Sequence, residues 1–428
     1  MEVLILVLTF VILLGIGVPI AWSIGLSSIL TMLVSIPTIP AFTTVAQRMA
    51  TGLDSFSLLA IPFFVLAGQI MNQGGIARRL INFARTLVGA LPGGLAHVNI
   101  IAAMLFGAIA GSAVAAASAI GGFMGKSMDE EGYDKEYAAA VNITSSTTGL
   151  IIPPSNVLIV YSLASGGVSI AALFLAGYVP GILTGLFLMI VAGFWAKRKG
   201  YPVGKRSKLS EVAKTFLEAL PSLLLLVVVI GGIVVGIFTA TEASAVAVLY
   251  CLILTWIYKE VKLKDLPNIF LASVGTTAIV MLLIGTSMSM SWIMAYENIP
   301  QNITSSLLSV SSNPIIILLI INMILLFVGV FMDITPAVLI FTPIFLPVVT
   351  ELGMHPTQFG IMMVLNLCIG LCTPPVGSVL FVGVGVGNTT IQKVVKPLLP
   401  LFVAMLLALI LVTYIPVLTL GLPELFGF

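Results

Sequence analysis

The chain has 428 residues, of which 59% are hydrophobic and only 8% are charged. Its mean hydropathy is +1.21, whereas roughly a quarter of the residues in an ordinary soluble domain are charged. The composition therefore excludes a soluble globular protein, and the formal net charge of +2 gives no indication of nucleic-acid binding. Apolar runs near the ~20 residues that a membrane-crossing helix needs recur along the whole length. We predict an all-α polytopic membrane protein.

The predicted elements fall into two similar halves. The N-terminus, Met1-Glu2-Val3, carries no basic segment, so we expect no cleaved signal peptide. In the first half we predict spans near residues 3–20, 21–36, 56–72 and 170–195, a re-entrant hairpin near 96–125 and a broken helix near 136–164. In the second half we predict spans near 217–237, 242–258, 271–295 and 391–416, a hairpin near 313–350 and a broken helix near 357–387. Amphipathic stretches near 40–54, 76–90 and 262–270 are either interfacial bracing arms or ordinary loop helices.

Five crossings in each half make the second half inverted relative to the first. We place the first repeat at 1–195, a cytoplasmic linker at 196–216 and the second repeat at 217–428. With the N-terminus outside, 17 of the 18 Lys and Arg residues fall on the inner side, Lys205 of the linker among them, and only Arg48 falls outside. Cytoplasmic loops of membrane proteins carry such an excess of Lys and Arg. Both termini are therefore expected to be periplasmic.

The two halves also share a sequence motif. GLIIPPSNV at 149–157 and GLCTPPVGS at 370–378 both read Gly-Leu-x-x-Pro-Pro, 221 residues apart. The same offset pairs Leu105-Phe106 with Leu326-Phe327, and Glu130 with Glu351. Inverted repeats with interrupted helices are typical of secondary transporters, whose substrate site lies near the middle of the membrane.

Adjacent prolines remove two backbone donors and force a helix to open. Inside a membrane, such an opening is tolerated only where it lines a cavity or binds a ligand. Freed carbonyls with nearby hydroxyls and amides suit Na⁺, and the N-termini of half-helices can hold a carboxylate. Two openings, one per repeat, therefore predict two cation sites that flank one anionic substrate. Helix packing through back-bonded Ser and Thr hydroxyls is the alternative for residues 145–148.

The hairpin tips are expected to face these openings. The first tip is rich in small residues, from Gly111-Ser112 to Ser118, and the second reads Met332-Asp333-Ile-Thr335-Pro336. Asp333 is an acid deep in a predicted membrane segment, where a carboxylate indicates function unless it only caps the returning half-helix. Glu242 lies near the end of a predicted span, where we expect structural anchoring.

These arguments give a set of candidate residues. We predict substrate contacts from Ser112, Ser118, Ser145, Ser146, Asn156, Asp333, Thr335 and Thr373. The first sodium site would comprise Gly111, Ser112, Thr148, Ser155 and Asn156. The second would comprise Met332, Asp333, Asn366, Thr373, Gly377 and Ser378. No catalytic residue is predicted.

Other functional classes are weaker. The segment Gly121–Ser127 is one residue too short for a phosphate-binding P-loop, and a membrane hairpin rather than a strand precedes it, so an ATP-driven pump is rejected. No H-E-x-x-H motif is present, which disfavours an intramembrane enzyme. Cys251, Cys368 and Cys372 are interpreted as buried apolar residues. An ion channel remains an alternative that only concentrative, sodium-dependent uptake would exclude.

The chain resembles the large membrane subunit of tripartite ATP-independent periplasmic (TRAP) transporters along essentially its whole length. The most specific segments are Ile61–Gly68 (IPFFVLAG), Gly236–Ala243 (GIFTATEA), Gly149–Asn156 and Gly370–Ser378. The resemblance implies an elevator-type transporter of a bacterial inner membrane. A mobile domain would hold both hairpins and both broken helices, and a scaffold would hold the outer spans.

The resemblance also implies partners and an energy source. A soluble periplasmic protein would deliver the substrate, a small four-helix membrane subunit on a separate chain would join the scaffold, and a Na⁺ gradient would drive uptake, with one sodium site near each hairpin tip. The implied substrate is an organic acid. The chain is more similar to the sialic-acid (N-acetylneuraminate) branch than to the C4-dicarboxylate branch, and a C4-dicarboxylate or another organic acid is the alternative.

Overall fold

The computed structural model describes residues 2–73, 75–204, 206–311 and 313–428. Met1 and Lys205, which entered the predictions for the N-terminus and the linker, lie outside these described residues. Throughout the described ranges the regular elements are helices, as predicted, and no strand occurs among them. Eight helical stretches in the described part are long and apolar enough to cross a membrane.

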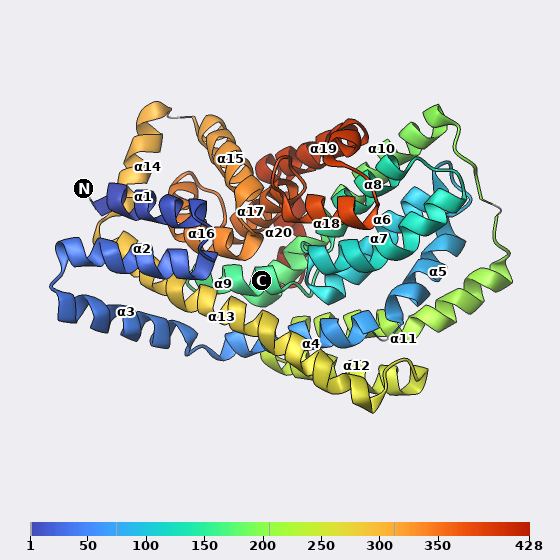
Figure 1. Ribbon diagram of the computed structural model, residues 1–428, viewed down its shortest axis with the longest axis horizontal. Coiled ribbons are helices and arrows are strands. Elements are labelled where there is room, and N and C mark those ends of the chain that lie inside the picture. The colour runs from blue at the N-terminus through green and yellow to red at the C-terminus, as the bar shows by residue number, and fades with distance from the viewer. Residues whose placement is uncertain (1, 74, 205, 312) are drawn as a thin grey trace.

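We divide the helices into an outer group and a core group (Figure 1). The outer group comprises α1 Glu2–Gly15, α2 Ile20–Ser35, α3 Thr38–Leu53, η1 Phe56–Leu59, α4 Ala60–Gln73, α5 Ile76–Val88, α11 Leu209–Val234, α12 Ala240–Tyr258, η2 Leu263–Asp265, α13 Leu266–Tyr296 and α14 Ile299–Val310. The core group comprises α6 Gly94–Ala110, α7 Ala113–Glu130, α8 Lys135–Thr148, α9 Asn156–Ala164, α10 Ile170–Lys199, α15 Pro314–Phe331, α16 Ile334–Glu351, α17 Pro356–Leu371, α18 Ser378–Val386, α19 Ile391–Tyr414 and α20 Val417–Leu425. The two groups meet where α5 contacts α6 and where α13 and α14 contact α16.

The core group contains both predicted hairpins and both predicted broken helices. Helices α6 and α7 are joined by two residues, Gly111 and Ser112, and α15 and α16 by Met332 and Asp333. The first broken helix is α8 and α9, and the second is α17 and α18. From Tyr137 to Thr148 every residue of α8 is buried, and so is every residue of α17 from Thr357 to Leu371. These two half-helices are therefore the centre of the molecule.

Several helix boundaries of the first half recur in the second half about 221 residues later, the offset of the sequence motif. Shifted by 221 residues, the bounds of α7 coincide with those of α16, and the start of α8 coincides with the start of α17. Helix α14, which the sequence analysis missed, lies where the same offset places α5. The inverted orientation of the halves stays a prediction.

Several predicted boundaries differ from the structure. The first two predicted crossings are α1 and α2, with 14 and 16 residues, which is short of the ~20 residues that a perpendicular crossing needs. Gly17, at φ +85°, and Pro19 separate these helices and end the apolar run early. The separate arm predicted at 262–270 is wrong, because η2 leads directly into the long helix α13. Helix α20 was also missed.

Glycine contacts hold each hairpin against a broken helix. A Cβ on Gly149 would lie 2.4 Å from the Cα of Gly107, and a Cβ on Gly370 would lie 2.5 Å from the Cα of Gly329. Contacts this short do not occur between real side chains and backbone, so α6 crosses α8, and α15 crosses α17, at distances that only glycine permits. Small residues have this role in membrane helix packing.

We expect Gly149→Ala to destabilise the fold, because the added methyl would push α6 and α8 apart. Overpacking of this kind costs about 1–3 kcal/mol. Gly385→Ala is the matched control, since a Cβ at this glycine of α18 meets nothing within 4 Å. Thermal unfolding in detergent measures both variants, and a Gly149→Ala protein that is as stable as the Gly385→Ala protein would contradict the crossing.

Candidate functional site

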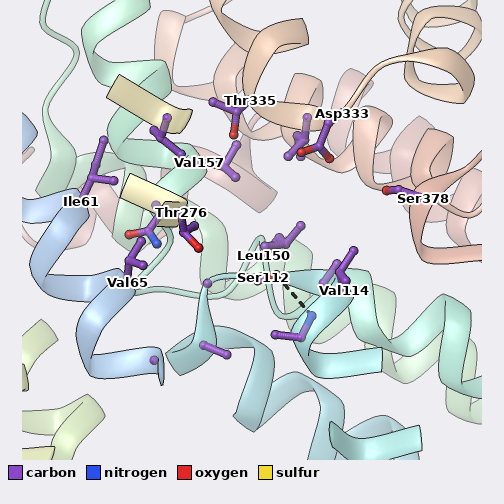
Figure 2. Close-up of a pocket in the computed structure, with 18 of the residues that line it drawn as sticks. Ile61, Val65, Ser112, Val114, Leu150, Val157, Thr276, Asp333, Thr335 and Ser378 are labelled. Atoms are coloured by element: carbon purple, nitrogen blue, oxygen red, sulfur yellow. Dashed lines mark hydrogen bonds between the residues drawn. The ribbon is translucent and has the colours of Figure 1, made fainter. Parts of the chain in front are cut away.

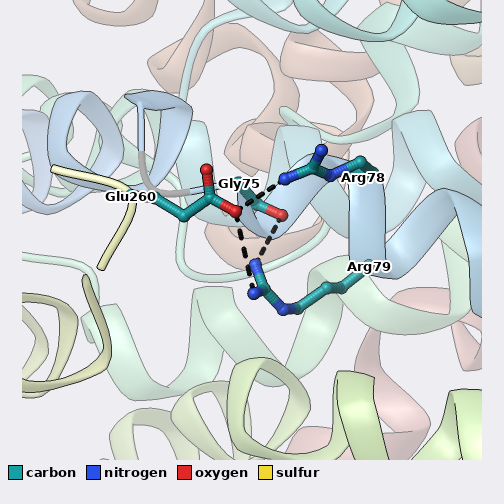
Figure 3. A network of polar contacts seen from close by, with 4 residues as sticks. All are labelled: Gly75, Arg78, Arg79 and Glu260. Carbon is teal, nitrogen blue, oxygen red and sulfur yellow. Dashed lines mark hydrogen bonds and ion pairs between the residues drawn. The ribbon is translucent and has the colours of Figure 1, made fainter. Parts of the chain in front are cut away.

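The two hairpin tips face each other across a cavity (Figure 2). At the first tip, Gly111 adopts the left-handed conformation at φ +62° and ends α6, and the Oγ of Ser112 accepts a hydrogen bond of 3.2 Å from the backbone N–H of Ala115 at the start of α7. At the second tip, Asp333 stands at the N-cap position of α16 with its side chain accessible from the cavity. Both returning half-helices therefore begin at the cavity.

The two Pro-Pro segments open the broken helices beside these tips. Helix α8 ends at Thr148 and α9 begins at Asn156, with a cis peptide bond between Pro153 and Pro154. Helix α17 ends at Leu371 and α18 begins at Ser378, with a cis peptide bond between Pro374 and Pro375. The predicted helix openings are thus present in both halves.

Four helix N-termini converge on this one cavity of about 220 Å³. It is lined by residues from the first turns of α7, α9, α16 and α18, including Ser112, Asn156, Asp333 and Ser378. Each N-terminus presents unpaired backbone N–H groups and a partial positive charge. No Lys or Arg is among the described residues that line the cavity. The site therefore favours an anion through backbone dipoles rather than through basic side chains.

The outer group forms the opposite wall of the cavity. Ile61, Val65, Gln69 and Asn72 of α4 follow one helix face at spacings of four, four and three residues, and Thr276 of α13 lies beside them. The sequence analysis missed the polar residues Gln69, Asn72 and Thr276. The helical row that begins at Ile61 could have indicated the first two, whereas nothing local to α13 indicates Thr276.

The structure brings six of the predicted site residues together at the cavity. These six are Gly111, Ser112, Asn156, Asp333, Thr335 and Ser378. The lining does not include Ser118, Ser145, Ser146, Thr148, Ser155, Met332, Asn366, Thr373 or Gly377. Direct substrate contacts from Ser118, Ser145, Ser146 and Thr373 are therefore not supported by this arrangement.

Local hydrogen bonds explain why several hydroxyls are turned away. In α8, Ser146 donates to the carbonyl of Asn142 at 2.5 Å, and Thr148 donates to the carbonyl of Ser145 at 2.6 Å. The Thr373 hydroxyl likewise donates to the carbonyl of Ile369 at 2.8 Å. Such back-bonding satisfies a polar side chain inside a helix, and it was the alternative considered for residues 145–148.

Two oxygen atoms at the cavity remain available for a ligand. The Oδ1 of Asn156 and the Oγ of Ser378 are buried and have no hydrogen-bond partner. Gly111 is close to this amide, since a Cβ on Gly111 would lie 2.7 Å from the Nδ2 of Asn156. Buried polar atoms are almost always paired, so these oxygens point to a bound water, a donor group or a cation.

Residues behind the cavity hold the openings in shape. The Asn366 side chain donates from Nδ2 to the backbone oxygen and to the Oδ1 of Asn322 at 2.9 and 2.8 Å, which ties α17 to α15. The Ser155 hydroxyl donates to the carbonyl of Leu150 at 2.5 Å across the first opening. These contacts give Asn366 and Ser155 a positioning role next to the two candidate oxygens.

We expect a cysteine at position 112 to react with a small water-soluble thiol reagent, because Ser112 lines the cavity. Ser146→Cys is the matched control, since Ser146 is fully buried and does not line the cavity. The native Cys251, Cys368 and Cys372 are free and 0% exposed, as the sequence analysis predicts, so background labelling should be low. Mass spectrometry measures the labelling, and equal labelling at positions 112 and 146 would contradict the geometry of the cavity.

Comparison with known proteins gives the family. Residues 7–418 match the family described as "Tripartite ATP-independent periplasmic transporter, DctM component". The uncharacterized protein YgiK of Salmonella typhimurium is 57% identical over 100% of this chain and 98% of its own length. The sialic acid TRAP transporter large permease protein SiaM of Vibrio cholerae is 42% identical, covering 89% of each chain. The C4-dicarboxylate TRAP transporter large permease protein DctM of Rhodobacter capsulatus is 39% identical, covering 96% of each.

A solved structure shows the same kind of fold. The YdaH transporter of Alcanivorax borkumensis superposes with a TM-score of 0.65 over 87% of each chain at 13% sequence identity. At this identity the likeness concerns the fold alone, whereas the family match extends over nearly every helix described above. The chain therefore belongs to the DctM component family, the large membrane permeases of tripartite ATP-independent periplasmic transporters, and is a transport protein rather than an enzyme.

Proposed function

We propose that this chain carries a small organic acid across the bacterial inner membrane together with Na⁺. The observation that carries the proposal is the convergence of four helix N-termini on a cavity whose described lining has no Lys or Arg. Backbone N–H groups at helix N-termini are ready-made sites for a carboxylate. In secondary transporters, interrupted helices supply both this anion site and the carbonyls that hold the coupling ion.

Sodium would bind beside the anion at each hairpin tip. The Asn156 amide oxygen in one half and the Ser378 hydroxyl in the other are unpaired, and Asp333 lies near the second. Oxygen donors suit hard cations, so this donor set fits Na⁺. Positive charge at these places would strengthen the field of the N-termini on the substrate carboxylate, and would thereby link anion binding to the sodium gradient.

An elevator movement is compatible with the way the cavity is built. Its lining comes from two groups of helices, with the hairpins and broken helices on one side and α4 and α13 on the other. A displacement of the core group past the outer group would move the four N-termini across the membrane, while α4 and α13 would stay in place. We propose that this displacement moves the bound acid between the two faces of the membrane.

N-acetylneuraminate is the substrate that we propose first. It has one carboxylate, one acetamido group and several hydroxyls, and the outer wall offers the neutral polar side chains Gln69, Asn72 and Thr276. A C4-dicarboxylate has a second carboxylate, for which the described lining holds no basic partner. Because SiaM and DctM are similarly related to this chain, a C4-dicarboxylate is the second candidate.

The proposed assembly has three components. A small four-helix membrane subunit on a separate chain would pack on the outer group, and a periplasmic binding protein would deliver the acid. The distribution of Lys and Arg favours periplasmic termini and a cytoplasmic loop near 196–216. No component of the proposed assembly hydrolyses ATP, so we expect the sodium gradient to supply the energy for uptake.

Uptake into proteoliposomes tests the proposal. With this chain, its small membrane subunit and the cognate binding protein, we expect concentrative uptake of radiolabelled N-acetylneuraminate that requires an inward Na⁺ gradient. Succinate is the comparison substrate. Sodium-driven uptake of succinate but not of N-acetylneuraminate would support the proposed mechanism and identify a C4-dicarboxylate as the substrate. Uptake that is indifferent to sodium, or that never exceeds equilibrium, would contradict the proposal and favour a channel.

Substitution of Asp333 tests its role at the second tip. The attraction between a carboxylate and a monovalent cation about 4 Å apart is about 4 kcal/mol at an effective dielectric constant of about 20, so Asp333→Ala and Asp333→Asn should raise the Na⁺ concentration for half-maximal uptake by about tenfold or more. Glu242→Gln is the control, because Glu242 forms a capping box with Thr239 at 2.8 Å and lies outside the cavity lining. Unchanged rate and sodium dependence in both Asp333 variants would show that this carboxylate has no coupling role.

A further inference from the structure

A second cavity lies at the basic end of the helix pair α10 and α19, which pack against each other. It encloses about 630 Å³ and is lined by Arg198 and Lys199 at the C-terminus of α10 and by Lys393 and Lys396 at the N-terminus of α19. The wall is completed by Asp134, Glu136, Tyr137, Trp195 and Pro397. We call this the α10–α19 pocket. It shares no lining residue with the substrate cavity.

The pocket keeps an excess of positive charge. Its lining has four basic and two acidic side chains. The Nζ of Lys199 lies 3.1 Å from Asp134, whose carboxylate also accepts a hydrogen bond of 2.7 Å from the Tyr201 hydroxyl. Within the described chain, the side chains of Arg198, Lys393 and Lys396 form no hydrogen bond or ion pair. Three cations are therefore free to bind an anion there.

Exposed apolar residues extend from the pocket along each helix. On α10 they follow Arg198 at every fourth residue and are 47–71% exposed: Phe194, Ile190, Leu186 and Ile182. Because four residues make slightly more than one helical turn, this row winds partly around α10 as it crosses the apolar part. On α19 a helical row passes in the same way from Lys396 into Leu399, Val403, Leu407 and Ile410, which are 47–58% exposed. At 1.5 Å per residue the α10 row is about 24 Å long, most of the thickness of a bilayer's hydrocarbon core.

Aromatic residues lie where the charged and apolar parts meet. The rings of Trp195 and Tyr137 stack with centroids 6.3 Å apart and an angle of 4° between planes, and the Tyr137 hydroxyl donates to the carbonyl of Ala192 at 2.8 Å. Trp and Tyr are enriched at the level of lipid headgroups. Tyr137 is buried and supports Trp195 from behind, so the partly exposed Trp195 is the ring that places the α10–α19 pocket near the membrane surface.

We propose that the α10–α19 pocket binds the headgroup of an anionic phospholipid. Arg198, Lys393 and Lys396 hold the phosphate, and the acyl chains lie along the two apolar rows. Arg and Lys are the usual partners of phosphate, and basic pockets between membrane helices on the cytoplasmic side bind anionic headgroups. A soluble anion would use the charges alone, whereas a phospholipid uses the charges and both rows.

Fluorescence quenching of Trp195 tests the proposal. The chain has four tryptophans, so the variant Trp22→Phe, Trp256→Phe, Trp292→Phe leaves Trp195 as the only reporter. The protein is placed in phosphatidylcholine bilayers with rising fractions of brominated phosphatidylglycerol or brominated phosphatidylcholine. Because each of the three cations strengthens binding about fivefold, we expect half-maximal quenching at a fraction of the anionic lipid that is lower by more than about tenfold. Lys396→Gln should reduce this preference about fivefold, the effect of one basic residue at an anionic surface.

The triple variant Arg198→Gln, Lys393→Gln, Lys396→Gln should abolish the preference. Lys259→Gln, Lys262→Gln, Lys264→Gln is the matched control, because it removes three positive charges from the loop after α12, on the same predicted side of the membrane and outside the pocket. Unchanged helical circular dichroism shows that each variant is folded. The single Lys396→Gln variant keeps the test valid if the triple variant misfolds, since Lys396 is exposed.

Several outcomes would overturn the proposal. Equal quenching by the two brominated lipids would show that the pocket does not select anionic headgroups, and so would an unchanged preference in the triple variant. Relief of quenching by millimolar inorganic phosphate would identify a site for soluble anions. Absence of quenching by either lipid would mean that protein covers the pocket. Because Trp195 and these cations lie outside the substrate cavity, none of these results depends on the transport assays.

Discussion

Two backbone crossings, one in each half, position the hairpin tips and helix openings that line one side of the cavity. At each crossing a hairpin helix and a broken helix approach to a distance that only glycine allows, with Gly107 against Gly149 and Gly329 against Gly370. The hairpin tip follows a few residues later and so lies beside the opened helix. Because close packing of small residues replaces the hydrophobic driving force inside a membrane, these contacts also hold the core group together.

The polar content of the central helices fits this packing. Buried Ser and Thr side chains of α8 are satisfied by carbonyls of their own helix, so the half-helix can be polar and still lie at the centre. At the four half-helix N-termini the first backbone N–H groups have no carbonyl of their own helix as a partner. Ser112 caps one of them, the N–H of Ala115, and these ends lie at the cavity, where an anion can use the remaining donors.

The sequence was sufficient to predict the two helix pairs with tight tips, the two openings and six residues that line the cavity, because glycine, proline and the repeat are local signals. It could have predicted α14 as well, since the offset of 221 residues places it opposite α5. Ser145 and Ser146 do not line the cavity, because their hydroxyls bond back to the carbonyl of Asn142, and back-bonded and ligand-facing hydroxyls look alike in a sequence. Thr276 comes to the cavity through tertiary packing alone, which no local pattern reports.

The cavity wall is divided between two groups of helices, and the two groups contribute different kinds of residues. The core group holds the four N-termini and the unpaired oxygens, whereas the outer wall holds Gln69, Asn72 and Thr276. Substitutions on α4 and α13 can therefore change the polar side chains that face the cavity, and with them its shape and polarity, while the arrangement of the four helix N-termini and the unpaired oxygens stays the same.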